Sequence, residues 1–158
     1  MKLKVFKVRE SAKLPVRAYP NDAGMDLFYC PKENYKDAVG RKEVRIGVGA
    51  GVLIPTGLKI GVPKGYMLEV KNKSGIAFKK RLIVGACVVD SGYDGEVFVN
   101  LHNVGSNTQY IRGGDKIAQL VMIPVVHFRT MQSDSQDLYR SPITISDRGD
   151  GALGSTDA

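Results

Sequence analysis

The chain has 158 residues, of which 43% are hydrophobic and 25% are charged, and its formal net charge is +7. This length and hydrophobic content predict one folded domain with a core of its own and exclude a disordered chain. No apolar run reaches the roughly 18 residues that a membrane helix needs, so no membrane contact is expected. The first ten residues alternate apolar side chains with lysines and do not resemble a secretory signal.

The positive charge predicts an anionic partner, and nucleic acid, an acidic membrane surface and a small polyphosphate are the candidates. The densest basic segment, residues 71–81, brackets Ser74 and Gly75 and is not an unbroken block of like charges. A phosphate pocket fits this spacing as well as a nucleic-acid groove. Cys30 and Cys87 have neither CxxC spacing nor a histidine neighbour, which favours free thiols over a disulfide or a zinc site. We expect a cytoplasmic protein, or one of the host-cell cytoplasm or nucleus if the source is viral.

In chain order, glycine and proline separate short β-branched runs, a pattern typical of a β-sandwich or barrel. The all-β prediction places strands at 3–8, 44–47, 51–55, 58–61, 66–70, 82–89, 96–103, 109–111 and 116–126. One short helix is expected at 75–81, with Ser74 as its N-cap. The polar segment 32–42 is expected to be a surface insertion. The chain therefore divides into a β-barrel body at 1–128 and, within the same domain, a C-terminal arm at 129–158.

The segment 85–103 is predicted to form a β-hairpin whose tip carries Asp90 and Tyr93. A continuous apolar run ends at Asp90, and the run that follows Glu96 alternates apolar and polar residues. A hairpin tip of this kind is either a plain turn or a site with one carboxylate and one aromatic ring. The residues of the tip alone leave both interpretations open.

Five short segments then occur in a fixed order, and with them the sequence resembles the trimeric dUTPase family (deoxyuridine 5′-triphosphate nucleotidohydrolases). They are AGMDL at 23–27, NKSGIA at 72–77, the Asp90 and Tyr93 tip, GDKIAQL at 114–120 and RGDGALGST at 148–156. The resemblance implies a jelly-roll-like subunit in a homotrimer whose active sites are shared between chains. It also implies hydrolysis of dUTP to dUMP and pyrophosphate, which keeps uracil out of DNA and supplies dUMP for thymidylate synthesis.

By this resemblance, Lys73, Ser74, Gly75 and Gln119 contact the phosphates of dUTP. Taken by themselves, the first three residues also fit a capped turn, and Gln119 also fits an amide that satisfies the backbone within a strand. Lys73 stands where the family usually has arginine, so a bidentate phosphate contact becomes a point-charge contact.

The terminal motif is expected to close over the bound nucleotide, whereas the default for such a tail is disorder. Its family-implied binding residues are Arg148, Leu153, Gly154, Ser155 and Thr156. Leu153 replaces the aromatic residue that usually stacks on uracil, and Ala152 replaces a glycine. Weaker stacking over the base is expected.

Asp90 is the expected catalytic residue, because a carboxylate on a rigid turn can orient and partly deprotonate a water for in-line attack. The resemblance implies that this attack is on the α-phosphorus, whereas taken by itself Asp90 also fits a turn cap. The expected cofactor is Mg²⁺, held by phosphate oxygens and waters without a direct protein ligand. Asp26 either contacts the water shell of that ion or has a structural hydrogen-bonding role.

Selection of uracil is assigned to the backbone of the two hairpin strands, with Gly85, Val88 and Phe98 among the binding residues. Tyr93 is expected to lie under the sugar and to exclude a 2′-hydroxyl. Val84 stands where many bacterial members have an asparagine, so only the main chain can contact the base there.

Two alternatives come with this assignment. One is a non-catalytic or moonlighting nucleotide-binding module, with 32–42 as the place to search for a regulatory protein partner. The other is a dCTP deaminase of the same fold, disfavoured because Gly95-Glu96-Val97 lacks a Thr-Leu-Glu-type run. The dUTPase assignment requires no nucleic acid, whereas the binding module would bind protein or nucleic acid through its basic surface.

Overall fold

The structure is a computed structural model that describes residues 2–35, 40, 42–135 and 138. The chain falls into two compact units, residues 1–127 and 128–158. In the second unit the described residues, 128–135 and 138, form neither helix nor strand. No helix in the described part of the chain has the length and apolar character that a bilayer crossing requires.

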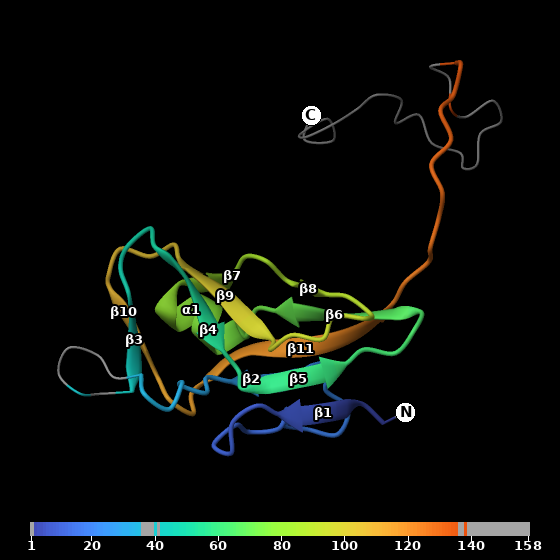
Figure 1. Ribbon diagram of the computed structural model, residues 1–158. Coiled ribbons are helices and arrows are strands. Elements are labelled where there is room, and N and C mark those ends of the chain that lie inside the picture. The colour runs from blue at the N-terminus through green and yellow to red at the C-terminus, as the bar shows by residue number, and fades with distance from the viewer. Residues whose placement is uncertain (1, 36–39, 41, 136–137, 139–158) are drawn as a thin grey trace. The chain divides into compact units, whose positions relative to one another are not determined.

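The first unit contains short antiparallel strands and one helix (Figure 1). The strands are β1 (Lys4–Lys7), β2 (Met25–Phe28), β3 (Glu43–Ile46), β4 (Gly51–Pro55), β5 (Leu58–Gly61), β6 (Tyr66–Lys71), β7 (Leu82–Val84), β8 (Val88–Val89), β9 (Phe98–Asn103), β10 (Gln109–Arg112) and β11 (Lys116–Pro124). The helix α1 (Ser74–Lys80) lies between β6 and β7 in the sequence.

Two larger sheets and two strand pairs form the body. One sheet has the order β2-β11-β6-β8 and the other the order β4-β9-β7, while β1 pairs with β5 and β3 with β10. Buried side chains from both larger sheets belong to one hydrophobic cluster, with Leu27, Leu68, Ile54 and Leu101 among its fully enclosed members. The all-β prediction is therefore confirmed.

Strand β9 shows how the sequence pattern sets the two faces of a strand. Val99, Leu101 and Asn103 are buried, and the alternating residues Phe98, Asn100 and His102 are exposed or half-buried. Side chains along a strand point to opposite faces with a period of two, so this alternation separates core from surface. The polar side chain of Asn103 is tolerated in the core because its amide donates to the carbonyl oxygens of Ile46, at 3.0 Å, and Asn107, at 2.9 Å.

The expected strand at 82–89 and the expected N-cap were wrong. The run divides into β7, which pairs with β9, and β8, which pairs with β6 in the other sheet. The N-cap is Lys73, which makes no side-chain capping bond, and Ser74 is the first helical residue. No strand was predicted at β2, because residues 26–28 are all buried and show no alternation with a period of two.

Gly57 and Gly65 offer a direct test of packing in this fold. Both have positive φ angles, +73° and +83°, which strain any residue with a Cβ. A Cβ on Gly57 would lie 2.7 Å from Ala12 Cβ and 2.8 Å from Cys30 Sγ, whereas a Cβ on Gly65 would meet nothing within 4 Å.

We expect Gly65→Ala to lower the free energy of unfolding by about 1 kcal/mol, the cost of left-handed backbone strain. Gly57→Ala should cost about 3 kcal/mol, because overpacking of the core adds to the same strain. Urea unfolding of both variants at equal protein concentration measures the difference. Equal losses would show that the crowding at Gly57 has no energetic effect.

Candidate functional site

Asp90 lies at the end of β8, on a tight turn that the chain holds by several local hydrogen bonds. The backbone N–H of Tyr93 donates to the Asp90 carbonyl oxygen at 3.2 Å, and the Tyr93 hydroxyl donates to the Glu96 carbonyl oxygen at 2.9 Å. Gly92 supplies a φ of +95° that the turn requires. Ser91 ties the turn to the neighbouring loop through a 3.2 Å bond to the Val62 carbonyl oxygen. The Asp90 side chain itself is exposed.

A charged pair anchors the end of this turn. Glu96 accepts hydrogen bonds from both terminal nitrogens of Arg9, and its Oε1 also accepts the Gly57 N–H at 2.7 Å. Arg9 in turn donates to the Cys30 carbonyl oxygen at 3.2 Å. The hydrogen bond with Glu96 raises the pKa of the Arg9 guanidinium, although burial opposes this. The pair joins the start of the chain to the strand that follows the Asp90 turn.

The predicted simple hairpin at 85–103 is replaced by an open fork. Near its base the Gly85 N–H donates to the Asn100 carbonyl oxygen at 2.9 Å, continuing the pairing of β7 with β9. Beyond Gly85 the two arms separate, because β8 pairs with β6 and β9 pairs with β4. A cavity of about 240 Å³ opens there, lined by Leu53, Val70, Ala86, Cys87, Val88, Val89, Asp90, Tyr93, Glu96, Val97, Phe98 and Asn100.

This cavity, which we call the fork cavity, brings together four residues expected from the sequence: Asp90, Tyr93, Val88 and Phe98. It also contains Asn100, which the sequence reasoning missed. The sequence signal for Asn100 is a polar residue on the half-buried face of the alternating run 97–103, and in the structure it lies opposite Gly85.

A second group of predicted residues gathers around Asp26. The Asp26 side chain is almost fully buried and makes ion pairs with Lys73 Nζ at 2.7 Å and Lys116 Nζ at 2.8 Å. Burial alone would raise the pKa of Asp26, but hydrogen bonds and charge from Lys116 and Lys73 outweigh it and lower the pKa below its ordinary value of 3.8. An ammonium group has three donors, so Lys73 retains two for another acceptor.

Lys73 leads directly into the first residues of α1, and we call Lys73, Ser74 and Gly75 the Ser74 corner. The first N–H groups of α1 that bond within the turn are those of Ile76 and Ala77, both to the Lys73 carbonyl oxygen. The N–H groups of Ser74 and Gly75 precede these bonds and belong to the unpaired start of the helix. With seven residues, α1 is too short for a substantial dipole. Anion binding at this corner therefore depends on individual donors and on the charge of Lys73.

Gln119 fixes the loop that carries Lys73. Its side-chain amide donates to the Asn72 carbonyl oxygen at 2.9 Å, while Asn72 Oδ1 accepts the Val84 N–H at 2.7 Å. A Cβ on Gly24 would lie 2.5 Å from Gln119 Oε1, so only glycine leaves room for the amide. These contacts connect the AGMDL, NKSGIA and GDKIAQL segments with the base of the fork.

The lining of the fork cavity includes none of Lys73, Ser74, Gly75 and Gln119. Arg148, Leu153, Gly154, Ser155 and Thr156, expected in the terminal motif, lie outside the described residues. Part of the 32–42 segment also lies outside them.

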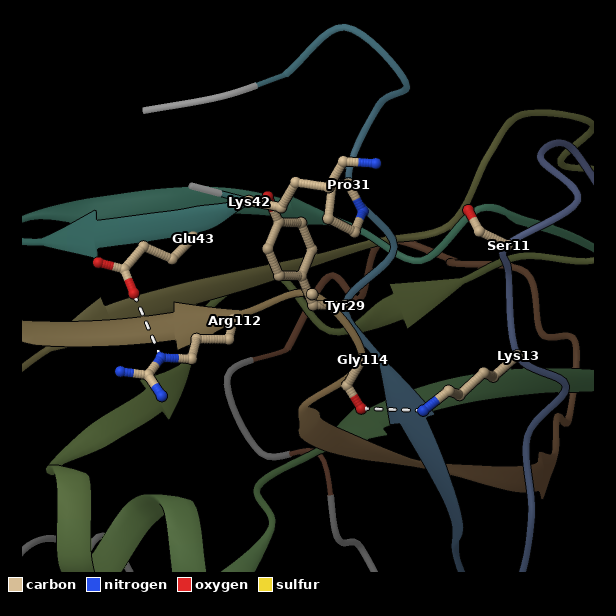
Figure 2. A pocket seen from close by; sticks show the side chains of 9 residues that line it. Ser11, Lys13, Tyr29, Pro31, Lys42, Glu43, Arg112 and Gly114 are labelled. Carbon is tan, nitrogen blue, oxygen red and sulfur yellow. Dashed lines mark hydrogen bonds and ion pairs between the residues drawn. The ribbon is translucent and has the colours of Figure 1, made fainter. Parts of the chain in front are cut away.

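A larger cavity of about 530 Å³ lies beside the β10–β11 turn (Figure 2). Its lining includes Lys13, Lys42 and Arg112, but also Glu43, which pairs with Arg112 at 3.3 Å. Burial raises the pKa of Tyr29, which also lines it, to about 12. None of the site residues expected from the sequence lines this cavity.

Comparison with known proteins extends these observations. The family model for dUTPase matches residues 10–156. A deoxyuridine 5′-triphosphate nucleotidohydrolase of Gloeothece citriformis is 34% identical over 158 residues, covering 99% of this chain and 97% of the relative. The enzyme of the same description from Arabidopsis thaliana is 37% identical over 153 residues, covering 97% and 81%.

Solved structures show the same fold. A mutant of the dUTPase of Staphylococcus bacteriophage 80alpha, with dUpNHpp, has a TM-score of 0.79 at 22% identity, covering 98% of this chain and 97% of that one. A mutant dUTPase of phage phi11 of S. aureus, in which a structural Mg(II) ion is coordinated, has a TM-score of 0.74 at 23% identity, covering 87% and 99%. The sheets therefore form a jelly-roll-like β fold. The chain belongs to the dUTPase family.

The Asp26 ion pairs give a pH-dependent prediction. Because the folded state lowers the pKa of Asp26, its contribution to stability is present above the unfolded pKa of about 3.9 and is lost as the pH falls through the folded pKa. We expect Asp26→Asn to be less stable than the wild type at pH 7, with the difference shrinking below about pH 4. Urea unfolding across this range measures it.

Asp134→Asn serves as the control, because Asp134 is exposed and lies outside the strands. A difference between Asp26→Asn and the wild type that stays constant down to pH 2 would contradict the assigned role of the two lysines.

Proposed function

We propose that this protein hydrolyses dUTP to dUMP and pyrophosphate, with Asp90 directing the attacking water. The observation that carries the proposal is the position of Asp90, on a fixed turn at the fork cavity, in a chain that belongs to the dUTPase family. The product dUMP is available for thymidylate synthesis, and removal of dUTP keeps uracil out of DNA.

In the reaction, the oxygen of a water attacks the α-phosphorus in line with the bond to the α–β bridging oxygen. That bond breaks, pyrophosphate leaves, and the water proton passes to the Asp90 carboxylate and then to solvent. The turn bonds of Tyr93 hold the backbone of Asp90, so the carboxylate starts from a defined place. The fork cavity, at about 240 Å³, accepts the nucleoside end of the substrate.

The phosphates are bound by the Ser74 corner. Lys73 supplies a positive charge and two remaining donors, and Ser74 adds a hydroxyl. Gln119 holds the Asn72–Lys73 loop with one amide hydrogen, and its other amide hydrogen donates to a phosphate oxygen. Arg148, Leu153, Gly154, Ser155 and Thr156 close over the nucleotide from the terminal arm.

Mg²⁺ fits this site as an ion held by the triphosphate oxygens and water. No three carboxylate, histidine or cysteine side chains gather into a metal site among the described residues. Both Asp26 oxygens face lysine ammonium groups, which disfavours Asp26 as a ligand and makes its role structural. When bound, Mg²⁺ neutralises charge on the phosphates.

The fork cavity has Asp90 in its lining but none of Lys73, Ser74 and Gly75, and this supports a homotrimer with shared sites. The fork cavity of one subunit faces the Ser74 corner of a neighbour, and the arm comes from another chain. The dCTP deaminase alternative receives no support from the relatives described above, which are dUTP hydrolases.

The first test is pyrophosphate release from dUTP with Mg²⁺, compared with release from dCTP, dTTP and UTP. We expect release confined to dUTP and a loss of about 10²-fold to 10⁴-fold in kcat for Asp90→Asn, because the general base is removed. Asp94→Asn is the matched control, since Asp94 is exposed in the same turn and pairs with Lys59 at 2.7 Å. It should keep most of its activity. No release by a folded wild type would favour the binding-module alternative.

The second test concerns the arm. A chain ending at Asp147 should form the trimer but lose turnover, because it lacks the motif that closes over the nucleotide. When this truncated chain and Asp90→Asn are refolded together in equal amounts, about a quarter of the sites combine an intact Asp90 with an intact arm, so activity should reappear. Light scattering checks the trimer in each sample. Full turnover by the truncated chain alone would refute the role of the arm, and no recovery in mixed trimers would refute shared sites.

A further inference from the structure

Asn100 lies on the wall of the fork cavity next to the base of the fork, and its side chain is held by three hydrogen bonds. Its Oδ1 accepts the Ala86 N–H at 3.1 Å and contacts His102 Nε2 at 2.8 Å. Its Nδ2 donates to the Val52 carbonyl oxygen at 3.3 Å. The side chain therefore connects β4, β9 and the start of the diverging arm.

These partners determine the orientation of the amide and the tautomer of the histidine. Ala86 N–H can only donate and the Val52 carbonyl oxygen can only accept, so Oδ1 must face Ala86 and Nδ2 must face Val52. Because Oδ1 is an acceptor, His102 must carry a proton on Nε2. One of the two amide hydrogens of Asn100 then has no acceptor among the described residues.

Two glycines fix the position of the His102 ring. A Cβ on Gly51 would lie 2.7 Å from His102 Nδ1, and a Cβ on Gly85 would lie 2.5 Å from His102 Nε2 and 2.4 Å from Asn100 Oδ1. These distances are far below ordinary van der Waals contact, so the ring occupies a slot that exists only because both residues are glycine. His102 is therefore held against Asn100.

We propose that Asn100 determines base specificity in the fork cavity by donating its remaining amide hydrogen to a carbonyl oxygen of the pyrimidine, with His102 as its positioning residue. The inference rests on the proposed function and deepens it. It adds a side chain to a base site that the sequence assigned to backbone groups alone.

The chemistry of the two pyrimidines explains the discrimination. Uracil has a carbonyl oxygen at its 4-position and accepts a hydrogen bond there, whereas cytosine has an amino group that donates. A fixed donor at Asn100 would face a second donor in cytosine and leave both unpaired in a site shielded from water. The Ala86 N–H and the Val52 carbonyl oxygen prevent the amide from turning over to offer Oδ1 instead, and His102 adds a second donor to Oδ1.

The test replaces this donor with an acceptor of the same size. Asn100→Asp should raise KM for dUTP about 10-fold and lower the ratio of kcat/KM for dUTP over dCTP at least about 10-fold, with a smaller effect on kcat. His102→Phe keeps a ring between Gly51 and Gly85 but removes the N–H. Its ratio of kcat/KM for dUTP over dCTP should therefore fall by less than that of Asn100→Asp. The matched control is Asn107→Asp, the same chemical change at an exposed asparagine away from the cavity, with an unchanged ratio.

Calorimetric titration of dUMP and dCMP provides a measurement that does not require turnover. Asn100→Ser, which lacks the amide but is small enough to avoid strain, is titrated beside Asn100→Asp, and thermal unfolding confirms that each variant is folded. A ratio of the two dissociation constants within twofold of the wild type in the folded variants would overturn the inference. If the wild type binds dUMP but releases no pyrophosphate, the proposed function fails while the binding ratio still tests Asn100. If the wild type binds neither nucleotide and releases no pyrophosphate from dUTP, both proposals fail.

Discussion

The transfer of the chain from one sheet to the other between β7 and β8 is the constraint on which the site depends. Only residues 85–87 separate a strand paired with β9 from a strand paired with β6. Had the pairing with β9 continued, backbone hydrogen bonds would fill the space that is now the fork cavity. The departure also leaves the Ala86 N–H without a strand partner, and the Asn100 side chain accepts it at 3.1 Å.

Much of this architecture could be predicted, and the failures have physical causes. The alternation in β9 and the glycine and proline spacing identified most strands, because burial on one face imposes a period of two. The division at 85–87 could not be read from the sequence, since residues 82–89 are apolar whichever sheet they join. Strand β2 was missed because both of its faces are covered, and burial of Asp26 there depends on lysines that are distant in sequence. Ser74 was misassigned as the N-cap because a favourable residue type does not reveal where the first helical turn begins.

For the site residues too, the sequence predicted some features and only the structure shows the others. The motif order pointed to Asp90, Tyr93, Lys73 and Gln119, and the structure supplies the contacts around each. The order of the motifs could not show that Gln119 bonds to the Asn72 carbonyl oxygen, because that contact follows from the antiparallel register of β11 against β2 and β6. Asn100 was missed for a related reason. Its importance comes from three partners that lie on different strands and that no local pattern relates.

Strand β6 serves both halves of the site at once. Leu68 and Glu69 support β8 and thereby the fork cavity, while Lys71 leads within two residues to Lys73 and lies opposite Gln119. If the proposed homotrimer places the fork cavity and the Ser74 corner of one subunit in different active centres, a single distortion of β6 would reach two of those centres. A kinetic defect caused by a β6 substitution would then combine changes in base recognition and in phosphate binding, and steady-state constants alone would not separate them.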